Sequence, residues 1–222
     1  MKVAILTLYT PNIKDYGSLS EINKKEYAKN HGYDFWVCRK SLNKNRAPAW
    51  SKIIMIKKFL SKYDWIFWTD ADSLIMNMDF CLEDIIKKYP GKFMILTKGV
   101  SSPINSGQWL IKNTKWSNVL LDKIWTKTPK YFIKNNPWEQ GSFVKLLDKS
   151  IWPKLAIVKH RAMNSVPNIK YINLACSRLL NREKVAEMEY RPGDFIVHFM
   201  FSKNPKKRLA GMKYYFKKIK TK

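Results

Sequence analysis

The sequence predicts an α/β protein with a single Rossmann-like, mostly parallel central sheet flanked by helices. Over residues 3–69, apolar runs of strand length alternate with helical segments in the order strand, helix, strand, helix, strand. The third strand, Trp65-Ile66-Phe67-Trp68-Thr69, is apolar on both faces, as is typical of a strand covered on both sides. The 222 residues suffice to bury one sizeable core, so we expect a single domain over residues 1–222.

Apolar periodicity and end signals define the elements in order. The expected strands are 3–9, 34–38, 65–69, 93–97, 108–112, 155–158 and 195–199. The expected helices are 18–30, 50–60, 82–88, 115–127, about 138–147 and about 205–219. Gly32 is expected to end the first helix, and Asn113-Thr114 to cap the fourth. Asn136-Pro137-Trp138-Glu139 predicts a helix start in which Asn136 is the N-cap and the Glu139 side chain bonds back to it.

The charge of the chain suggests an anionic partner. The sequence has 42 Lys and Arg residues against 17 Asp and Glu, a formal net charge of +25. This balance favours a phosphorylated substrate, a nucleic acid or an acidic membrane surface. A solubilising lysine surface with no partner explains the same charge equally well.

Cysteine usage and the lack of targeting signals predict an intracellular protein. Cys38, Cys81 and Cys176 are far apart and form neither a disulfide framework nor a zinc-binding spacing. Residues 1–10 do not have the pattern of a signal peptide, and no run approaches the ~18 apolar residues of a membrane span. We therefore expect a cytoplasmic protein, soluble or peripherally associated with a membrane.

The leading candidate site follows the buried strand 65–69. Asp70 and Asp72 are separated there by one small residue, Ala71. Ligands of open α/β sheets bind beyond the carboxyl ends of the strands, and on an extended backbone both carboxylates can converge on one Mg²⁺ or Mn²⁺. No glycine-rich phosphate loop follows the first strand, so a nucleotide would need the metal to neutralise its phosphates. A helix cap or turn is the alternative explanation for Asp-x-Asp.

Four other segments carry polar groups that folding alone does not require. They are Asn105-Ser106-Gly107-Gln108 before a strand, Trp138-Glu139-Gln140-Gly141 at a helix start, His198 in an apolar run, and Lys203. Small residues let the backbone approach a sugar closely. His198 is either a metal ligand or a core histidine, and Glu139 is a site residue, the capping partner of Asn136, or both.

Taken in order, these segments resemble glycosyltransferase family 34, the α-galactosyl-, mannosyl- and xylosyltransferases of the GT-A fold. The resemblance covers roughly residues 50–203. It rests on Trp50-x-Lys52, residues 65–76, Asn105-Ser106-Gly107, residues 110–122, Glu139-Gln140, residues 161–165 and residues 195–199.

The resemblance implies a metal-dependent, retaining transfer from a nucleotide sugar, with a UDP-sugar favoured over a GDP-sugar, to a glycan or other hydroxyl acceptor. It implies Mn²⁺ (or Mg²⁺) held by Asp70, Asp72 and His198, and a donor diphosphate contacted by Lys203. It places the donor against Thr7, Leu8, Tyr9, Lys52, Ala71, Asn105, Ser106 and Gly107. Glu139 and Gln140 match a family Asp-Gln pair at the reacting face of the sugar, with the carboxylate one methylene longer.

Two alternatives to this reading remain. One is an inverting sugar transferase on the same scaffold. The other is a nucleic-acid-binding protein, suggested by the net charge and the interspersed aromatics. Because the carboxylates lie at the centre of the fold and no nucleic-acid motif is present, we expect no nucleic-acid partner.

The C-terminal part of the chain predicts a basic amphipathic helix at about 205–219. Leu209, Met212, Phe216 and Ile219 would pack on the domain, leaving lysines to face an anionic membrane. Typical eukaryotic members of the family also carry an N-terminal anchor, a stem and longer middle and C-terminal segments. Relative to them, we expect a reduced and open acceptor side.

Overall fold

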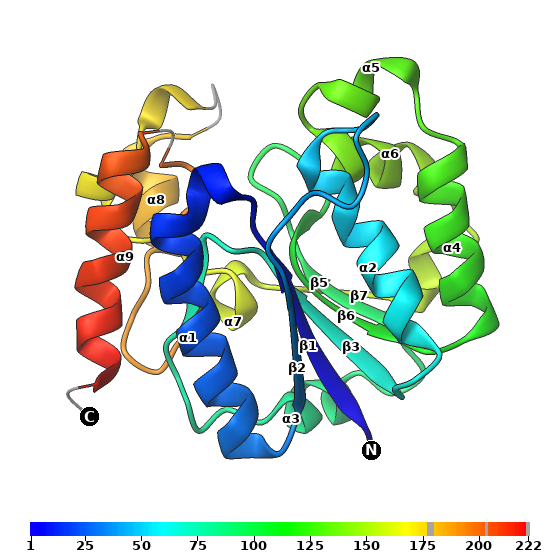
Figure 1. Cartoon of the computed structure of the whole chain (residues 1–222), viewed down its shortest axis with the longest axis horizontal. Coiled ribbons are helices and arrows are strands. Elements are labelled where there is room, and N and C mark those ends of the chain that lie inside the picture. The colour runs from blue at the N-terminus through cyan, green and yellow to red at the C-terminus, as the bar shows by residue number, and fades with distance from the viewer. Residues whose placement is uncertain (177–179, 203, 221–222) are drawn as a thin grey trace.

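The computed structural model describes residues 1–176, 180–202 and 204–220 (Figure 1). Its strands are β1 (Val3–Leu8), β2 (Asp34–Cys38), β3 (Trp65–Thr69), β4 (Ser73–Ile75), β5 (Met94–Thr97), β6 (Asn105–Lys112), β7 (Leu155–Val158) and β8 (Ile196–His198). Its α-helices are α1 (Lys14–His31), α2 (Ser51–Leu60), α3 (Leu82–Lys88), α4 (Lys115–Thr126), α5 (Lys130–Lys134), α6 (Trp138–Leu146), α7 (His160–Met163), α8 (Arg182–Met188) and α9 (Pro205–Lys220).

The central sheet confirms the predicted fold class. Its described strands lie in the order β2-β1-β3-β6-β5-β7, and only β6 runs antiparallel to its neighbours. The segment from β1 to β3 forms the expected βαβαβ unit, with β1 between β2 and β3. The predicted strand at 195–199 does not join the central sheet. Instead β8 pairs with β4 in a separate antiparallel ribbon.

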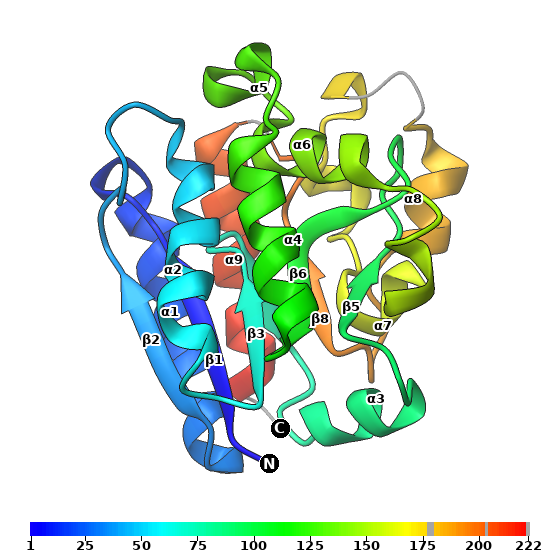
Figure 2. The ribbon, with the colours of Figure 1, turned by 90° about the vertical axis from the view of Figure 1, so that its right-hand side faces the viewer.

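Helices cover both faces of the sheet, as the two-sided apolar strand β3 predicted (Figures 1 and 2). Ile66 and Trp68 point into one core, which contains side chains of α2, α4 and α6. Trp65 and Phe67 point into a second core, which contains side chains of α1, α3 and α7. This alternation follows from the two-residue period of a strand, and it removes both faces of β3 from water.

Helix α9 packs beside α1 at one side of the molecule (Figure 1). Met212 and Tyr215 are buried against Tyr16, Val197 and Phe199. The other members of the predicted apolar stripe, Leu209, Phe216 and Ile219, pack against the same cluster. The expected docking of the C-terminal helix is therefore confirmed. No helix in the described residues combines the length and apolarity needed to span a bilayer.

Local end signals were correct at two helices and wrong at a third. Gly32 ends α1 with a left-handed φ of 68°, and the Thr114 side chain accepts from the Ser117 N–H at the start of α4. The predicted capping box at residues 136–139 does not form: α6 begins at Trp138 without a side-chain cap, after a cis Asn136–Pro137 bond. Glu139 instead turns into the interior, because it pairs there with Lys52.

Several element boundaries also differ from the predicted ones. Helix α1 begins at Lys14, before the expected residue 18, and β6 begins at Asn105, so that Asn105-Ser106-Gly107 belong to the strand. The short elements β4, α5, α7 and α8 were not predicted. Each is at most seven residues long, too short to give a clear period in the sequence.

Candidate active site

A cleft of about 640 Å³ opens beyond the carboxyl ends of β1 and β3. Most residues that the resemblance assigns to a donor site line it: Leu8, Tyr9, Lys52, Asp70, Ala71, Asp72, Asn105, Ser106, Gly107, Glu139, Gln140 and His198. Thr7 was also expected to support the nucleotide, but it is fully buried and does not line the cleft. Lys203 lies outside the described residues.

Asp70 and Asp72 lie in the turn that joins β3 to β4, not on the extended backbone that the sequence argument assumed. The chain turns there because β4 must leave the main sheet to pair with β8. The Asp70 N–H donates to the Gly107 carbonyl at 2.9 Å, and the Ser73 hydroxyl donates to the Asp70 carbonyl at 2.7 Å. These bonds fix the turn at both of its ends.

A buried polar stripe on α1, formed by Ser20, Asn23 and Lys24, makes hydrogen bonds to the same turn and to the strand β4 that follows it. The Ser20 hydroxyl donates to the Ser73 carbonyl at 2.9 Å. Asn23 accepts from the Ile75 N–H at 2.7 Å and donates to the Ile75 carbonyl at 2.9 Å. The stripe therefore supplies hydrogen-bond partners to both ends of the short strand β4, which otherwise pairs only with β8 among the described strands.

Lys24 is the charged member of this stripe. Its ammonium group donates to the Asp70 carbonyl at 2.6 Å and lies 3.3 Å from the Thr69 carbonyl. Burial lowers its pKa to about 7, although the charges of Asp70 and Asp72 oppose the shift. Lys24 thus places a donor under the Asp-x-Asp turn.

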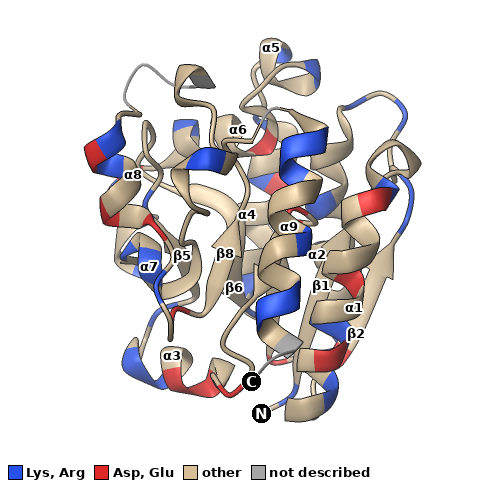
Figure 3. Cartoon of the chain, turned by 90° about the vertical axis from the view of Figure 1, so that its left-hand side faces the viewer, with Lys and Arg blue, Asp and Glu red and all other residues tan. Residues whose placement is uncertain are grey.

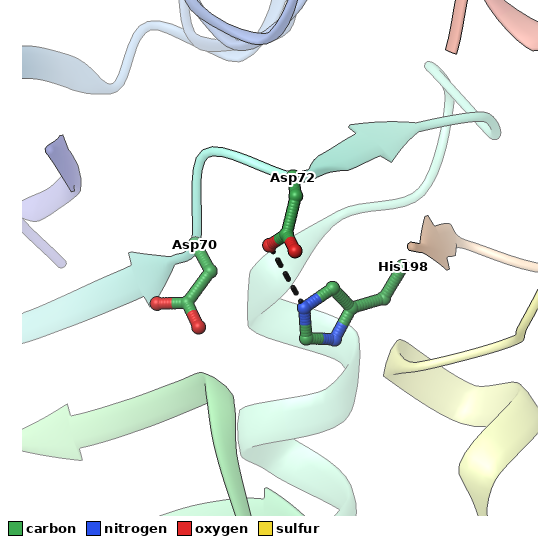
Figure 4. A group of neighbouring side chains, drawn as sticks. All are labelled: Asp70, Asp72 and His198. Carbon is green, nitrogen blue, oxygen red and sulfur yellow. Dashed lines mark hydrogen bonds and ion pairs between the residues drawn. The ribbon is translucent and has the colours of Figure 1, made fainter. Parts of the chain in front are cut away.

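His198 faces Asp72 across the ribbon of β4 and β8 (Figure 4). Its Nε2 atom lies 3.1 Å from Asp72 Oδ1, and its Nδ1 atom lies 2.7 Å from Asn164 Oδ1. In this amide orientation Nδ1–H donates to Asn164, which leaves Nε2 for a ligand on the side of the carboxylates. Both ring nitrogens of this buried histidine thus have partners, and one partner is a carboxylate of the Asp-x-Asp turn.

Asp72 also contacts a cation from the C-terminal helix. Nη1 of Arg208, from α9, lies 3.4 Å from Asp72 Oδ2. Burial by itself would raise the pKa of Asp72, but the interactions of its carboxylate with His198 and Arg208 outweigh burial and hold that pKa well below the usual range. Asp72 is therefore ionised, and its negative charge is stabilised by contacts with His198 and Arg208.

Asp70 belongs to a second, buried group of charges. Lys52 lies 3.1 Å from Asp70 Oδ1 and 2.8 Å from Glu139 Oε1, and it donates to the Ser106 carbonyl at 2.6 Å. Burial alone would lower the pKa of Lys52, but the two carboxylates raise it above the usual value. Lys52 therefore stays charged between the Asp-x-Asp turn and α6.

Ser106 connects the same group to the cleft wall. Its hydroxyl donates to Glu139 Oε1 at 2.9 Å, and its N–H donates to Gln140 Oε1 at 3.0 Å. The other carboxylate oxygen, Glu139 Oε2, is buried without a hydrogen-bond partner among the described residues. A buried carboxylate oxygen without a partner is costly, and the two bonds to Oε1 hold the carboxylate in place despite this cost.

Asp70, Asp72 and His198 together fit a divalent cation. One ligand atom from each residue can be chosen so that all lie within 4.8 Å of one another. Two carboxylates and one imidazole suit Mn²⁺ and, through the oxygens, Mg²⁺. The Asn164 contact to the far ring nitrogen is the kind of outer support that metal-binding histidines usually have.

Sequence reasoning missed four side chains that organise this site. Trp68 donates from Nε1 to Asp70 Oδ1 at 2.7 Å, and the others are Lys24, Asn164 and Arg208. Asn164 lies in a segment that carried the family resemblance, which was its only signal. Lys24 and Arg208 were indistinguishable from the many other basic residues of the chain.

Comparisons with known proteins point to a family of sugar transferases. A family model described as the galactosyl transferase GMA12/MNN10 family matches residues 10–90 and 85–207. An "Uncharacterized alpha-1,2-galactosyltransferase" of Schizosaccharomyces pombe is 29% identical over 220 residues, covering 80% of this chain and 54% of that protein. The "Probable alpha-1,6-mannosyltransferase MNN10" of Saccharomyces cerevisiae is 25% identical over 183 residues, covering 65% of this chain and 46% of that protein. The chain thus spans about half the length of these curated relatives.

Solved structures share the fold. The crystal structure of a glycosyltransferase involved in glycosylation of the major capsid of PBCV-1 matches with a TM-score of 0.74 and 18% identity, covering 96% of this chain and 100% of that one. The galactosyltransferase LgtC, in complex with donor and acceptor sugar analogs, matches with a TM-score of 0.56 and 12% identity, covering 98% of this chain and 95% of that one. The fold is that of the GT-A glycosyltransferases, and by its family match the chain belongs to the galactosyl transferase GMA12/MNN10 family.

Proposed function

We propose that residues 1–222 act as a glycosyltransferase domain that moves a sugar from a nucleotide sugar, with a UDP-sugar favoured, to a hydroxyl of a glycan or another acceptor. The observation that carries the proposal is the convergence of Asp70, Asp72 and His198 on one point of the cleft. Relatives named galactosyl-, mannosyl- and xylosyltransferases support the reaction class.

A divalent ion, Mn²⁺ or Mg²⁺, would supply positive charge against the donor diphosphate and so stabilise the leaving group. Asp70, Asp72 and His198 would hold it, and Asn164 orients the histidine ring for that task. Lys203 is expected to contact the diphosphate. Leu8 and Tyr9, at the end of β1, are placed to support the nucleotide.

The donor sugar would lie against Asn105, Ser106 and Gly107, with Glu139 and Gln140 at its reacting face. Lys52 and Ser106 fix the position of the Glu139 carboxylate through its Oε1 atom. The bond from the anomeric carbon to the phosphate oxygen breaks as the acceptor oxygen bonds to that carbon, and the acceptor proton passes to the leaving diphosphate.

We further propose that the configuration at the anomeric carbon is retained. Common UDP-hexose donors are α-linked, and two of the relatives named above carry "alpha" linkages in their names. An α-product from an α-donor requires retention. Proton NMR of the newly formed linkage distinguishes this outcome from inversion, because the two anomers differ in the coupling constant of the anomeric proton.

The donor class is tested by thermal unfolding of the wild type and Asp72→Ala with UDP-, GDP- and CMP-sugars, each with and without Mn²⁺. A ligand at 100 times its dissociation constant stabilises by roughly 2.7 kcal/mol. We expect stabilisation by a UDP-sugar only with Mn²⁺, lost in Asp72→Ala and kept in the control Asp122→Ala, an exposed residue of α4.

If no nucleotide sugar stabilises the wild type, the proposed site is not a donor site. Duplex DNA then becomes the ligand to test, because steep salt-dependent binding to random DNA would support the nucleic-acid alternative.

We also propose that α9 contacts an anionic membrane surface. Its apolar stripe packs on the protein, while Lys206, Lys207, Lys213 and Lys217 are exposed. Basic residues recur along α9 (Figure 3). Contact through lysines adds about 1 kcal/mol per residue near the surface and weakens with salt. We expect the variant with these four lysines changed to Gln to lose binding to phosphatidylserine vesicles. The matched variant Lys25, Lys29, Lys87 and Lys88→Gln should keep it, and equal binding by both variants would contradict the proposal.

A further inference from the structure

Arg208 brings a positive charge from α9 to the metal-site carboxylate Asp72. Its Nη1 atom lies 3.4 Å from Asp72 Oδ2 and donates to the Tyr16 hydroxyl at 3.0 Å. The side chain lines the cleft and is 19% exposed, so a ligand in the cleft can reach the guanidinium. The C-terminal helix is therefore part of the candidate active site, and not only a surface element.

Within the part of the chain that the structure describes, one other cationic side chain lines the cleft, and its existing contacts occupy it. Among the described residues, the Lys and Arg side chains that line the cleft are Lys52 and Arg208. Lys52 is 4% exposed and already contacts Asp70 and Glu139. Of these two described side chains, Arg208 is therefore the one that additional negative charge in the cleft can contact.

The contact between Arg208 and Asp72 can be replaced. At 3.4 Å it is longer than the usual 2.7–2.9 Å of a charge-assisted hydrogen bond. A divalent ion at Asp72 would compete with Arg208 for the carboxylate, because the ion carries twice the charge. The guanidinium, whose planar donors suit two oxygens of a phosphate, would then face the phosphates that the metal binds.

We propose that Arg208 is a diphosphate-binding residue that contacts Asp72 in the free protein and pairs with the diphosphate of the nucleotide donor once a metal ion occupies Asp72. The inference rests on the proposed function, and it adds a residue that neither the sequence motifs nor the resemblance assigned. It also gives α9 a role in donor binding.

This role predicts effects of opposite sign when Arg208 is changed. Removing its charge takes a competing cation away from Asp72, so Mn²⁺ alone should bind more tightly, by roughly threefold to tenfold. The same change removes a charge-assisted contact to phosphate, so UDP in the presence of Mn²⁺ should bind about 10- to 100-fold more weakly. A residue that only anchors α9 would weaken both equilibria together.

The experiment is isothermal titration calorimetry of the full chain with Mn²⁺ alone, and then with UDP, GDP and uridine at saturating Mn²⁺. The variants are Arg208→Gln, Arg208→Lys and the control Arg182→Gln, an exposed residue at the start of α8 that does not line the cleft. Uridine lacks phosphates, so its affinity should not change in any variant. Arg208→Lys keeps the charge but not the planar fork, so UDP affinity should fall between the wild type and Arg208→Gln.

Two results separate this inference from the proposed function. If the wild type binds UDP with Mn²⁺ and Arg208→Gln binds it within twofold, or binds Mn²⁺ alone more weakly, Arg208 is not a diphosphate residue and the transferase proposal stands. If the wild type binds neither UDP nor GDP in the presence of Mn²⁺, the donor site itself is wrong and this inference fails with it. Melting temperatures of all variants identify any loss of affinity caused by unfolding.

Discussion

Lys52 and Glu139 form a buried ion pair between α2 and α6. The Lys52 ammonium lies 2.8 Å from Glu139 Oε1, and the two side chains are 4% and 5% exposed. The same ammonium lies 3.1 Å from Asp70. A single cation thus joins the expected sugar-facing carboxylate to the expected metal-binding turn, and its removal leaves two acids without their common partner.

Lys52→Met should destabilise the protein by about 3–5 kcal/mol, because breaking a buried ion pair leaves uncompensated charge. The double variant Lys52→Met with Glu139→Gln should recover part of this loss, since one of the two unpaired carboxylates is then neutral. Urea unfolding of the wild type, both single variants and the double variant gives the coupling. Purely additive effects would mean that the pair contributes no interaction energy.

Asn23→Leu should destabilise by about 2–4 kcal/mol, because the buried N–H and carbonyl of Ile75 would both lose their side-chain partner. The neighbouring exposed residue provides the control: Ile22 is 52% exposed, and Ile22→Ala should stay within about 0.5 kcal/mol of the wild type. Both are measured by urea unfolding. Similar values for the two variants would show that the polar stripe of α1 does not hold β4.

Gly107→Ala should disturb the proposed metal site directly. A Cβ at this position would overlap Cε1 of His198 and lie 3.0 Å from its Nδ1, a contact too close to persist. The buried histidine ring must then move, and Mn²⁺ affinity should fall by about 10- to 100-fold, as it does when support of a ligand is lost.

The same glycine substitution in a His198→Ala background tests this explanation. With the ring absent, Gly107→Ala should have no further effect on Mn²⁺ binding measured by calorimetry. An equal loss in both backgrounds would place the effect of the substitution elsewhere, for example in the strand pairing of β6.

Tyr215 should make the protein sensitive to alkaline pH. Burial raises the pKa of this phenol to about 12 in the folded protein, against about 10 for an exposed tyrosine. Between pH 10 and 12 the unfolded chain therefore releases a proton that the folded chain retains, and stability falls as pH rises. Tyr215→Phe should show a shallower fall over this range in urea unfolding, and a slope identical to that of the wild type would contradict the assignment.

The elements of the central sheet could be predicted because their signals are local. The apolar run at Trp65–Thr69 indicates burial on both faces without knowledge of its neighbours, and Thr114 and Gly32 determine helix ends through bonds and dihedral angles within a few residues. The Asp-x-Asp pair was found in the same way, since its chemistry depends on residue type and on its place after a buried strand. These features are properties of short stretches of sequence.

Only the tertiary structure decided how the site is assembled. Asp70 and Asp72 lie in a turn because β4 pairs with β8, a strand more than a hundred residues away in sequence. Lys24, Asn164 and Arg208 reach the turn from α1, from the end of α7 and from α9. Glu139 prefers Lys52 to a capping bond because an ion in the interior requires a partner. Long-range pairing and the cost of burying charge set these positions, and neither leaves a periodic trace in the sequence.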